Sequence, residues 1–153
     1  MQEFTVRQIE IMEAATSRIS KFGIQNLTIK TLAEDIGLSE PALYRHFKSK
    51  NEILFSLLEY FKTEMKNRIQ SIPIKITDTE ADKLRAIFNS QLKTFVSKPA
   101  IVSVIFAESI FHYEENLSNK VSEIMEMMQE FVKANISKGK ELGQYNQLIG
   151  ASA

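Results

Sequence analysis

The stretch that decides the fold is TIKTLAEDIGLSEPALYRHF, residues 28–47. Thr28 is a favourable N-cap for a short helix with apolar residues at helical spacing, and Gly37 is a typical helix stop. Ser39 is again an N-cap, followed by Pro41 in the first turn, where a missing backbone N–H removes no hydrogen bond. The stretch therefore predicts two short helices, the second reaching about Phe47, joined by a tight turn around a glycine.

A longer helix is predicted before this stretch, from about Thr5 to Phe22. Thr5 and Gln8 form a capping box, and Gly23 is expected to end the helix in a left-handed turn. Its apolar residues recur every three or four positions: Val6, Ile9, Met12, Ala15, Ile19 and Phe22. Packed on this helix, the two short helices have the spacing of a helix-turn-helix DNA reader, in which the second short helix lies in the major groove.

A long helix is predicted after the stretch. Ser49 is its N-cap, Glu52 completes a second capping box, and an apolar stripe continues to about Ile72. Pro73 then breaks the helix, and the β-branched residues around it disfavour its resumption. This helix is therefore expected to lead away from the helix-turn-helix into the rest of the chain.

The remaining segments also predict helices. Thr77 and Glu80 indicate a third capping box, opening a helix to about Val96. Four apolar residues of this helix are expected to face inward: Leu84, Phe88, Leu92 and Phe95. Pro99 begins a helix that is apolar on nearly every side and should be buried. A last helix, with apolar residues from Leu117 onward, is expected to end at Gly143. With no strand-like alternation of useful length, the predicted fold is all-α.

Composition excludes several classes of protein. The chain has no cysteine, hence no disulfide framework or thiolate chemistry, and no apolar run near the roughly 18–20 residues of a membrane span. We therefore expect a cytoplasmic protein with no membrane partner. The 19 basic residues balance the 19 acidic ones, so bulk charge does not indicate nucleic-acid binding. The positions of the basic residues are more informative than the net charge, because four of the seven basic residues in positions 1–50 lie within Lys30–Lys50.

The segment from Arg7 to Leu54 closely resembles the DNA-binding domain of TetR-type bacterial transcriptional repressors. The resemblance rests on three motifs in order: Thr-Ile at 28–29, Leu-Ala-x-x-Ile-Gly-Leu-Ser at 32–39, and Leu-Tyr-x-His-Phe-x-Ser-Lys at 43–50. It implies a three-helix DNA-binding domain over residues 1–48. It also implies a helical ligand-binding and dimerisation domain over residues 49–153, entered through the long helix.

The resemblance assigns DNA contacts to ten positions: Thr28, Lys30, Ser39, Glu40, Pro41, Ala42, Tyr44, Arg45, His46 and Lys50. In such repressors the residue at Tyr44 reaches the DNA backbone, and those at Thr28, His46 and Lys50 meet phosphates. Which of the others reads a base edge stays open. Phe47 is expected in the core and Lys48 in solvent.

The resemblance also implies a homodimer on a palindromic DNA operator, nucleoid-associated when bound, and a small apolar or aromatic inducer. The candidate pocket residues are aromatic, leucine and methionine side chains of the body: Phe61, Met65, Phe88, Leu92, Phe95, Phe106, Phe111, Met125 and Met128. TetR-type proteins usually continue with two more helices that pair across the dimer. The C-terminal dimerisation helices are therefore expected to be missing or truncated.

Other functions find less support in the residues. Glu108 and His112 stand four residues apart and could form a metal pair, but no third ligand is evident, so no metal and no cofactor are expected. No catalytic constellation or glycine-rich phosphate loop is present, and we expect no enzyme activity. The alternative that near-zero net charge favours is a helical ligand carrier or protein-interaction module without sequence-specific DNA binding.

Overall fold

The computed structural model describes residues 4–106 and 115–147. Within those ranges the secondary structure is entirely helical, which confirms the all-α prediction. The elements are α1 (Val6–Phe22), a short 3₁₀ helix η1 (Ile24–Asn26), α2 (Ile29–Asp35), α3 (Glu40–Tyr44), α4 (Lys50–Gln70), α5 (Glu80–Ser97), α6 (Pro99–Ile105) and α8 (Glu115–Glu141).

Local capping signals set most helix boundaries, as predicted. The capping box of Thr5 and Gln8 is present at the start of α1. Gly37 has φ +64°, and the Leu38 N–H donates to the Ala33 carbonyl at 2.9 Å, so a Schellman motif ends α2. Gly23 also has positive φ, but its ψ of 159° places it outside the left-handed helical region that we expected.

Two predicted boundaries are wrong. The third helix ends at Tyr44 instead of Phe47, because the chain turns there to reach the next N-cap. In α5 the N-cap is Thr79, with Asp82 completing the capping box, and not Thr77. The Asp78 carboxylate accepts the Lys75 N–H at 2.8 Å, so a turn occupies the residues that we assigned to the first turn of the helix.

A third predicted cap is half correct. Ser49 caps α4, its Oγ accepting the Glu52 N–H at 3.1 Å. The Glu52 carboxylate does not return to Ser49, however; it accepts the backbone N–H of Lys48. The bond still satisfies a donor at the end of the loop that leads from α3 into α4.

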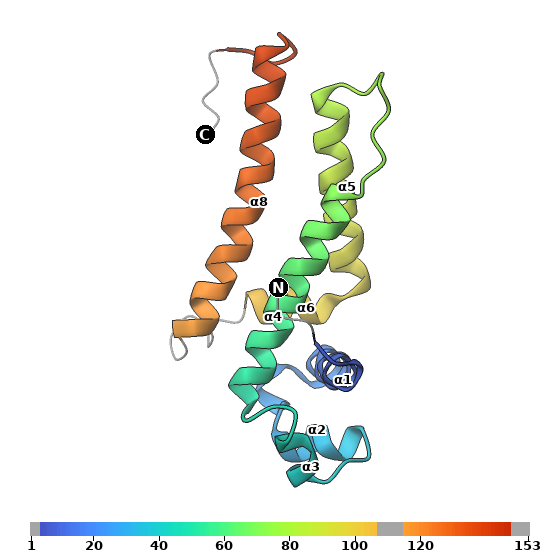
Figure 1. The fold of residues 1–153 in the computed structure, drawn as a ribbon, viewed down its shortest axis with the longest axis vertical. Helices are drawn as coiled ribbons and strands as arrows, with labels where there is room; N and C mark the ends of the chain where they lie inside the picture. Colours follow the sequence, from blue (N-terminus) through green and yellow to red (C-terminus); the bar gives the residue numbers. More distant parts are fainter. Residues whose placement is uncertain (1–3, 107–114, 148–153) are drawn as a thin grey trace.

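Figure 1 shows the arrangement: α2 and α3 lie at one end of the molecule, and α4 runs from that end into the body beside α5 and α8. Helix α6 packs against α1, and α4 contacts α1, α5, α6 and α8. The helix that leaves the predicted DNA-binding head is thus also part of the body.

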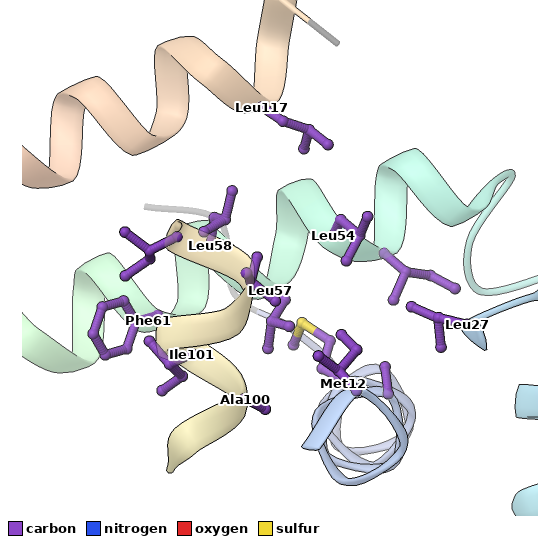
Figure 2. Packing of buried hydrophobic residues seen from close by; sticks show 14 of the residues in the cluster. Met12, Leu27, Leu54, Leu57, Leu58, Phe61, Ala100, Ile101 and Leu117 are labelled. Atoms are coloured by element: carbon purple, nitrogen blue, oxygen red, sulfur yellow. The ribbon is translucent and has the colours of Figure 1, made fainter. Parts of the chain in front are cut away.

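The buried side chains form one continuous core. Figure 2 shows Met12 of α1 and Ile101 of α6 facing Leu57 and Phe61 of α4, with Leu117 of α8 on the other side of α4. Helix α4 supplies the largest share of the core: Ile53, Leu54, Leu57, Leu58, Phe61, Met65 and Ile69. Burial of one such side chain contributes about 1.5–3 kcal/mol to folding.

The predicted inward face of α5 is partly wrong. Phe88 and Leu92 are 46% and 59% exposed. The inward position belongs to Gln91, which is buried and accepts a hydrogen bond from Arg68 of α4 at 2.7 Å. Ile87, about one turn before Gln91, is also on the inward side, and both Ile87 and Phe95 are partly buried against the core.

Three more apolar positions that we placed in stripes or buried helices are exposed. Val6 and Phe22, at the two ends of α1, are 76% and 57% exposed, and Phe106 at the end of α6 is 62% exposed. Ile11, which the predicted stripe omitted, is fully buried. The rest of α6 is mostly buried, as expected from its composition.

Polar links fix the register between α4 and α8. The buried Lys120 of α8 forms ion pairs with Glu59 of α4 at 2.6 Å and with Glu123 at 2.7 Å, and its ammonium lies over the Phe55 ring. Lys62 of α4 reaches the same Glu123 carboxylate at 2.6 Å. Because a buried ion pair requires matched geometry, these contacts favour one position of α8 along α4.

A second polar cluster joins the start of α5 to the end of α8. The Asn135 side-chain amide donates to the carbonyl and the carboxylate of buried Glu80, and the Tyr145 hydroxyl donates to the Asn135 Oδ1 at 3.0 Å. The Tyr145 ring lies so close to Gly139 that a Cβ there would sit 2.2 Å from it. Gly139 is therefore required by this close approach.

Replacing Gly37 with alanine should lower the free energy of unfolding by about 1–2 kcal/mol, because an L-residue is strained at φ +64°. Nothing lies within 4 Å of the added Cβ, so the loss would report backbone strain and not a clash. Urea unfolding of Gly37→Ala measures it, with Gly37→Asn as the control, since asparagine tolerates the left-handed region. Equal stability of all three proteins would contradict the assignment.

Candidate nucleic-acid interface

The candidate interface is the surface of α3, the start of α2 and the loop leading into α4, here called the recognition surface. Figure 1 places α2 and α3 at the end of the molecule that is remote from α5 and α8. Leu43 and Phe47 are 0% and 1% exposed and anchor the back of α3 in the core. The placement of Phe47 agrees with its prediction as a core aromatic, and the opposite side of α3 is left open to solvent.

The residues assigned to base edges lie on that open side. Lys30, Glu40, Pro41 and Arg45 are exposed, and Ala42 is half-buried. These side chains offer cationic donors, a carboxylate acceptor and a small apolar contact, which are the groups used to distinguish base pairs in the major groove.

Tyr44 is the exposed aromatic of the recognition surface. Its side chain is 48% exposed although it follows the buried Leu43. A phenol in this position carries a hydroxyl that can donate to a phosphate and a ring edge that can contact a thymine methyl. The exposure leaves Tyr44 accessible to a ligand, and it does not pack as a core aromatic.

Two hydroxyl groups of the candidate set also cap helices. Thr28 Oγ1 accepts the Thr31 N–H at 3.1 Å, and Ser39 Oγ accepts the Ala42 N–H at 3.3 Å. A hydroxyl that accepts one bond keeps its own O–H as a donor; Thr28 Oγ1 also lies 2.9 Å from Thr31 Oγ1, where either oxygen can donate, so the Thr28 O–H is available to a phosphate when Thr31 is the donor. Capping and phosphate binding by Thr28 or Ser39 are therefore compatible.

Lys50 is held at the base of the recognition surface. Its Nζ donates to the Ile24 carbonyl at 3.0 Å, across the sequence from α4 to η1. Burial lowers the pKa of the Lys50 ammonium. An ammonium group has three donors, so one bond to Ile24 leaves others for an anion.

His46 lies where α3 meets the loop to α4, and its side chain is half-buried. Its carbonyl accepts a bond from the Gln8 side chain of α1 at 3.3 Å. Sequence reasoning assigned Gln8 to a capping box but missed this contact to the far end of α3. The contact joins two segments that are distant in the chain, so no local pattern indicates it.

The charges of the head fall into two groups. Arg18 is used internally: its guanidinium pairs with both Asp35 oxygens, at 2.7 and 2.8 Å, and lies over the Phe22 ring. Lys30 and Arg45 form no ion pair within the described parts of the chain, and the same holds for the exposed Lys48. The recognition surface thus keeps a local positive charge in a chain of zero net charge.

The candidate ligand-pocket residues do not converge in the described structure. Phe61 lines a cavity between α1, α4 and α6, and Met65 is buried in the core. Phe88, Leu92, Phe106 and Met125 are exposed, whereas Phe95 and Met128 are partly buried beside the core. Phe111 lies outside the described residues, as do Glu108 and His112 of the considered metal pair.

Neither a metal-binding cluster nor a membrane-spanning helix is found among the described residues. No group of three or more His, Cys, Asp or Glu side chains in residues 4–106 and 115–147 is arranged to hold a metal ion. None of the helices described there has the length and apolar character that crossing a membrane requires.

Replacing Arg18 with methionine should lower the free energy of unfolding by about 1–3 kcal/mol, because hydrogen bonds to a charged group are lost and the Asp35 carboxylate keeps no cation. Arg7→Met is the matched control, since Arg7 forms a single exposed pair with Glu10 that contributes under about 1 kcal/mol. Chemical denaturation of both variants tests this. A smaller loss for Arg18→Met than for Arg7→Met would show that the internal pair is not structural.

Comparison with known proteins agrees with the helix-turn-helix arrangement of α2 and α3. Residues 11–57 match the family model described as bacterial regulatory proteins of the tetR family. Nucleoid occlusion factor SlmA of Photobacterium profundum is 28% identical over 129 residues, which cover 82% of this chain and 64% of that protein. The chain thus spans less than two thirds of the length of the curated relatives that it first matches.

Solved structures share the fold. A TetR transcription regulator from Haloarcula marismortui superposes with a TM-score of 0.82 at 25% identity, covering 97% of this chain and 77% of that one. The structure of AibR with isovaleryl coenzyme A and operator DNA gives a TM-score of 0.74 at 16% identity, covering 95% and 78%. The helix-turn-helix lies inside residues 11–57, the segment that matches the model of the tetR family of bacterial regulatory proteins, and the whole described chain shares the fold of such regulators.

Proposed function

We propose that the protein is a transcriptional repressor that binds a palindromic DNA operator as a homodimer and is released by a small molecule bound in its helical body. The observation that carries the proposal is the recognition surface, which is anchored from behind by buried residues and open in front. In this proposal residues 1–48 form the DNA-binding domain and residues 49–153 the ligand-binding and dimerisation domain.

Base reading is proposed for the open edge of α3 and the start of α2. In this proposal Lys30 or Arg45 donates to guanine O6 and N7, and the Glu40 carboxylate accepts from cytosine N4. Ala42 and Pro41 present small apolar surface suited to a thymine methyl. Each good base contact is worth about 1–3 kcal/mol of discrimination.

Phosphate binding is proposed for the residues around that edge. Tyr44 and the two capping hydroxyls, of Thr28 and Ser39, donate O–H groups, and His46 lies beside them. Lys50 contributes its ammonium while keeping its bond to Ile24. That bond would orient the ammonium before DNA arrives, so less side-chain entropy is lost on binding.

Dimerisation is part of the proposal because one short recognition helix contacts few base pairs. Two heads related by a two-fold axis would read two half-sites about one helical turn apart. The AibR complex supports operator binding by a protein of this fold, since that structure contains operator DNA.

Ligand release is proposed to act through α4. Because α4 packs against α1 in the head and against α5 and α8 in the body, a ligand that favours one arrangement of the body would alter the position of the head. The ligand of AibR is an acyl thioester of coenzyme A. This supports a ligand with an apolar part, in agreement with the proposed apolar or aromatic inducer. The repressor would act in the bacterial cytoplasm, on the nucleoid.

A second candidate function is nucleoid occlusion, which the similarity to SlmA favours. The recognition surface alone does not separate the two functions. Transcript levels in cells with and without the gene separate them. Higher transcription of genes beside the bound sites in cells that lack the gene supports the repressor. Unchanged transcription together with altered cell division in those cells supports the second candidate.

Selection of bound sequences from a random duplex pool should enrich a palindrome for the unaltered protein. Tyr44→Ala and Arg45→Ala should each lower affinity for the selected duplex by about 5- to 150-fold, the equivalent of about 1–3 kcal/mol per contact. Lys93→Ala, an exposed position on α5, is the matched control and should bind normally. Fluorescence anisotropy measures all four proteins.

Three outcomes would contradict the proposal in different ways. Failure to enrich any sequence would favour a helical carrier or interaction module. Enrichment of a single half-site would contradict the dimer. Equal losses for the Tyr44 and Lys93 variants would show that DNA binds elsewhere on the molecule.

A further inference from the structure

A cavity lies where α1, α4 and α6 meet, here called the junction cavity. It has a volume of about 140 Å³, and its apolar lining consists of Met12 of α1, Leu57 and Phe61 of α4, and Ile101 of α6. Figure 2 labels these four side chains, which come from the three helices around the cavity. An apolar cavity of about 150 Å³ is large enough to bind benzene, so this one can hold the apolar part of a small ligand.

The junction cavity also has a polar side. Glu13 and Thr16 of α1 line it together with Tyr60 and Glu64 of α4 and Lys98 at the start of α6. A second hollow, of about 260 Å³, shares Glu13, Thr16 and Lys98 and continues over Ser17, Ser20 and Lys21 of α1. An apolar pocket therefore opens into a polar hollow, which is suited to an amphipathic molecule.

Two carboxylates, of Glu13 and Glu64, line the junction cavity together with one ammonium, of Lys98, and Lys21 adds a second ammonium at the adjoining hollow. The Glu13 carboxylate is exposed and forms no ion pair within the described parts of the chain. Glu64 is paired with the Lys98 ammonium at 3.4 Å, both partly exposed. Burial raises the pKa of the Tyr60 phenol, and the nearby carboxylates of Glu64 and Glu13 raise it further.

We propose that the junction cavity binds a small amphipathic amine, with an apolar group of about the size of a benzene ring among Met12, Leu57, Phe61 and Ile101 and the ammonium at Glu13. Aromatic rings at the pocket favour the cation further. Of the candidate inducer residues, only Phe61 lines this cavity in the described structure. The cavity therefore shares one residue with the inducer pocket proposed for the body, and the rest of its lining lies on α1, α4 and the segment of α6.

Isothermal titration calorimetry of the full chain with benzylamine tests the proposal, with benzoate and benzyl alcohol as probes of similar size and different charge. Benzylamine should bind more tightly than either. Glu13→Gln should weaken benzylamine binding about fivefold, as expected for one partly exposed ion pair. Thr16→Leu, which fills the shared wall of both hollows, should abolish it.

Glu10→Gln is the matched control, because Glu10 lies one turn away on α1 and does not line the cavity. Its affinity for benzylamine should equal that of the unaltered protein. Absence of benzylamine binding, equal binding of benzyl alcohol, or equal losses for the Glu10 and Glu13 variants would overturn the proposal. Circular dichroism checks that each variant folds. If Thr16→Leu does not fold, the affinity of Glu13→Gln for benzylamine tests the proposal alone. None of these readouts depends on DNA binding.

Discussion

The burial of α4 is the constraint on which the rest of the structure depends. Its apolar residues pack against α1 near the head and against α5, α6 and α8 further along, so one helix belongs to both ends of the core. Truncating one buried leucine or isoleucine of such a helix costs about 2–5 kcal/mol. The head therefore cannot be displaced far from the body unless α4 moves with it or loses these contacts.

Polar contacts make this arrangement specific. At its start α4 is linked to η1 through Lys50, in its middle to α8 through Glu59 and Lys120, and near its end to α5 through Arg68. Apolar packing tolerates small shifts along a helix, whereas hydrogen-bonded ion pairs lose most of their energy when the geometry changes. The same contacts would transmit a shift of the body to the recognition surface.

Much of the fold could be predicted from the sequence because its signals are local. Thr28, Ser39 and Gly37 determine the helix-turn-helix through bonds that span a few residues. Contacts between distant segments could not be predicted in this way. The apolar spacing of α5 indicated a helix but not which side faces inward, because the inward side is the one whose residues contact the core and Arg68 of α4, and local spacing does not report those contacts.

The candidate site shows the same difference between local signals, which could be predicted, and contacts between distant segments, which could not. The resemblance to TetR-type repressors identified the exposed residues of α3 as candidate DNA contacts. The structure shows that the buried side chains of Leu43 and Phe47 hold those residues toward solvent. The internal role of Arg18 depends on Asp35, seventeen positions later, and no pattern in either helix reveals it. The DNA contacts themselves stay predictions, since no contact within the protein reports on them.

The central claim is that α3 and its flanks bind DNA. The most direct measurement is a nuclear magnetic resonance titration of the ¹⁵N-labelled full chain with the selected duplex, following every backbone amide. If α3 and its flanks bind DNA, the largest shift changes fall between Thr28 and Lys50, with small ones in α5 and α8. Shift changes concentrated in α5 or α8, or no change at a saturating concentration of duplex, would contradict it.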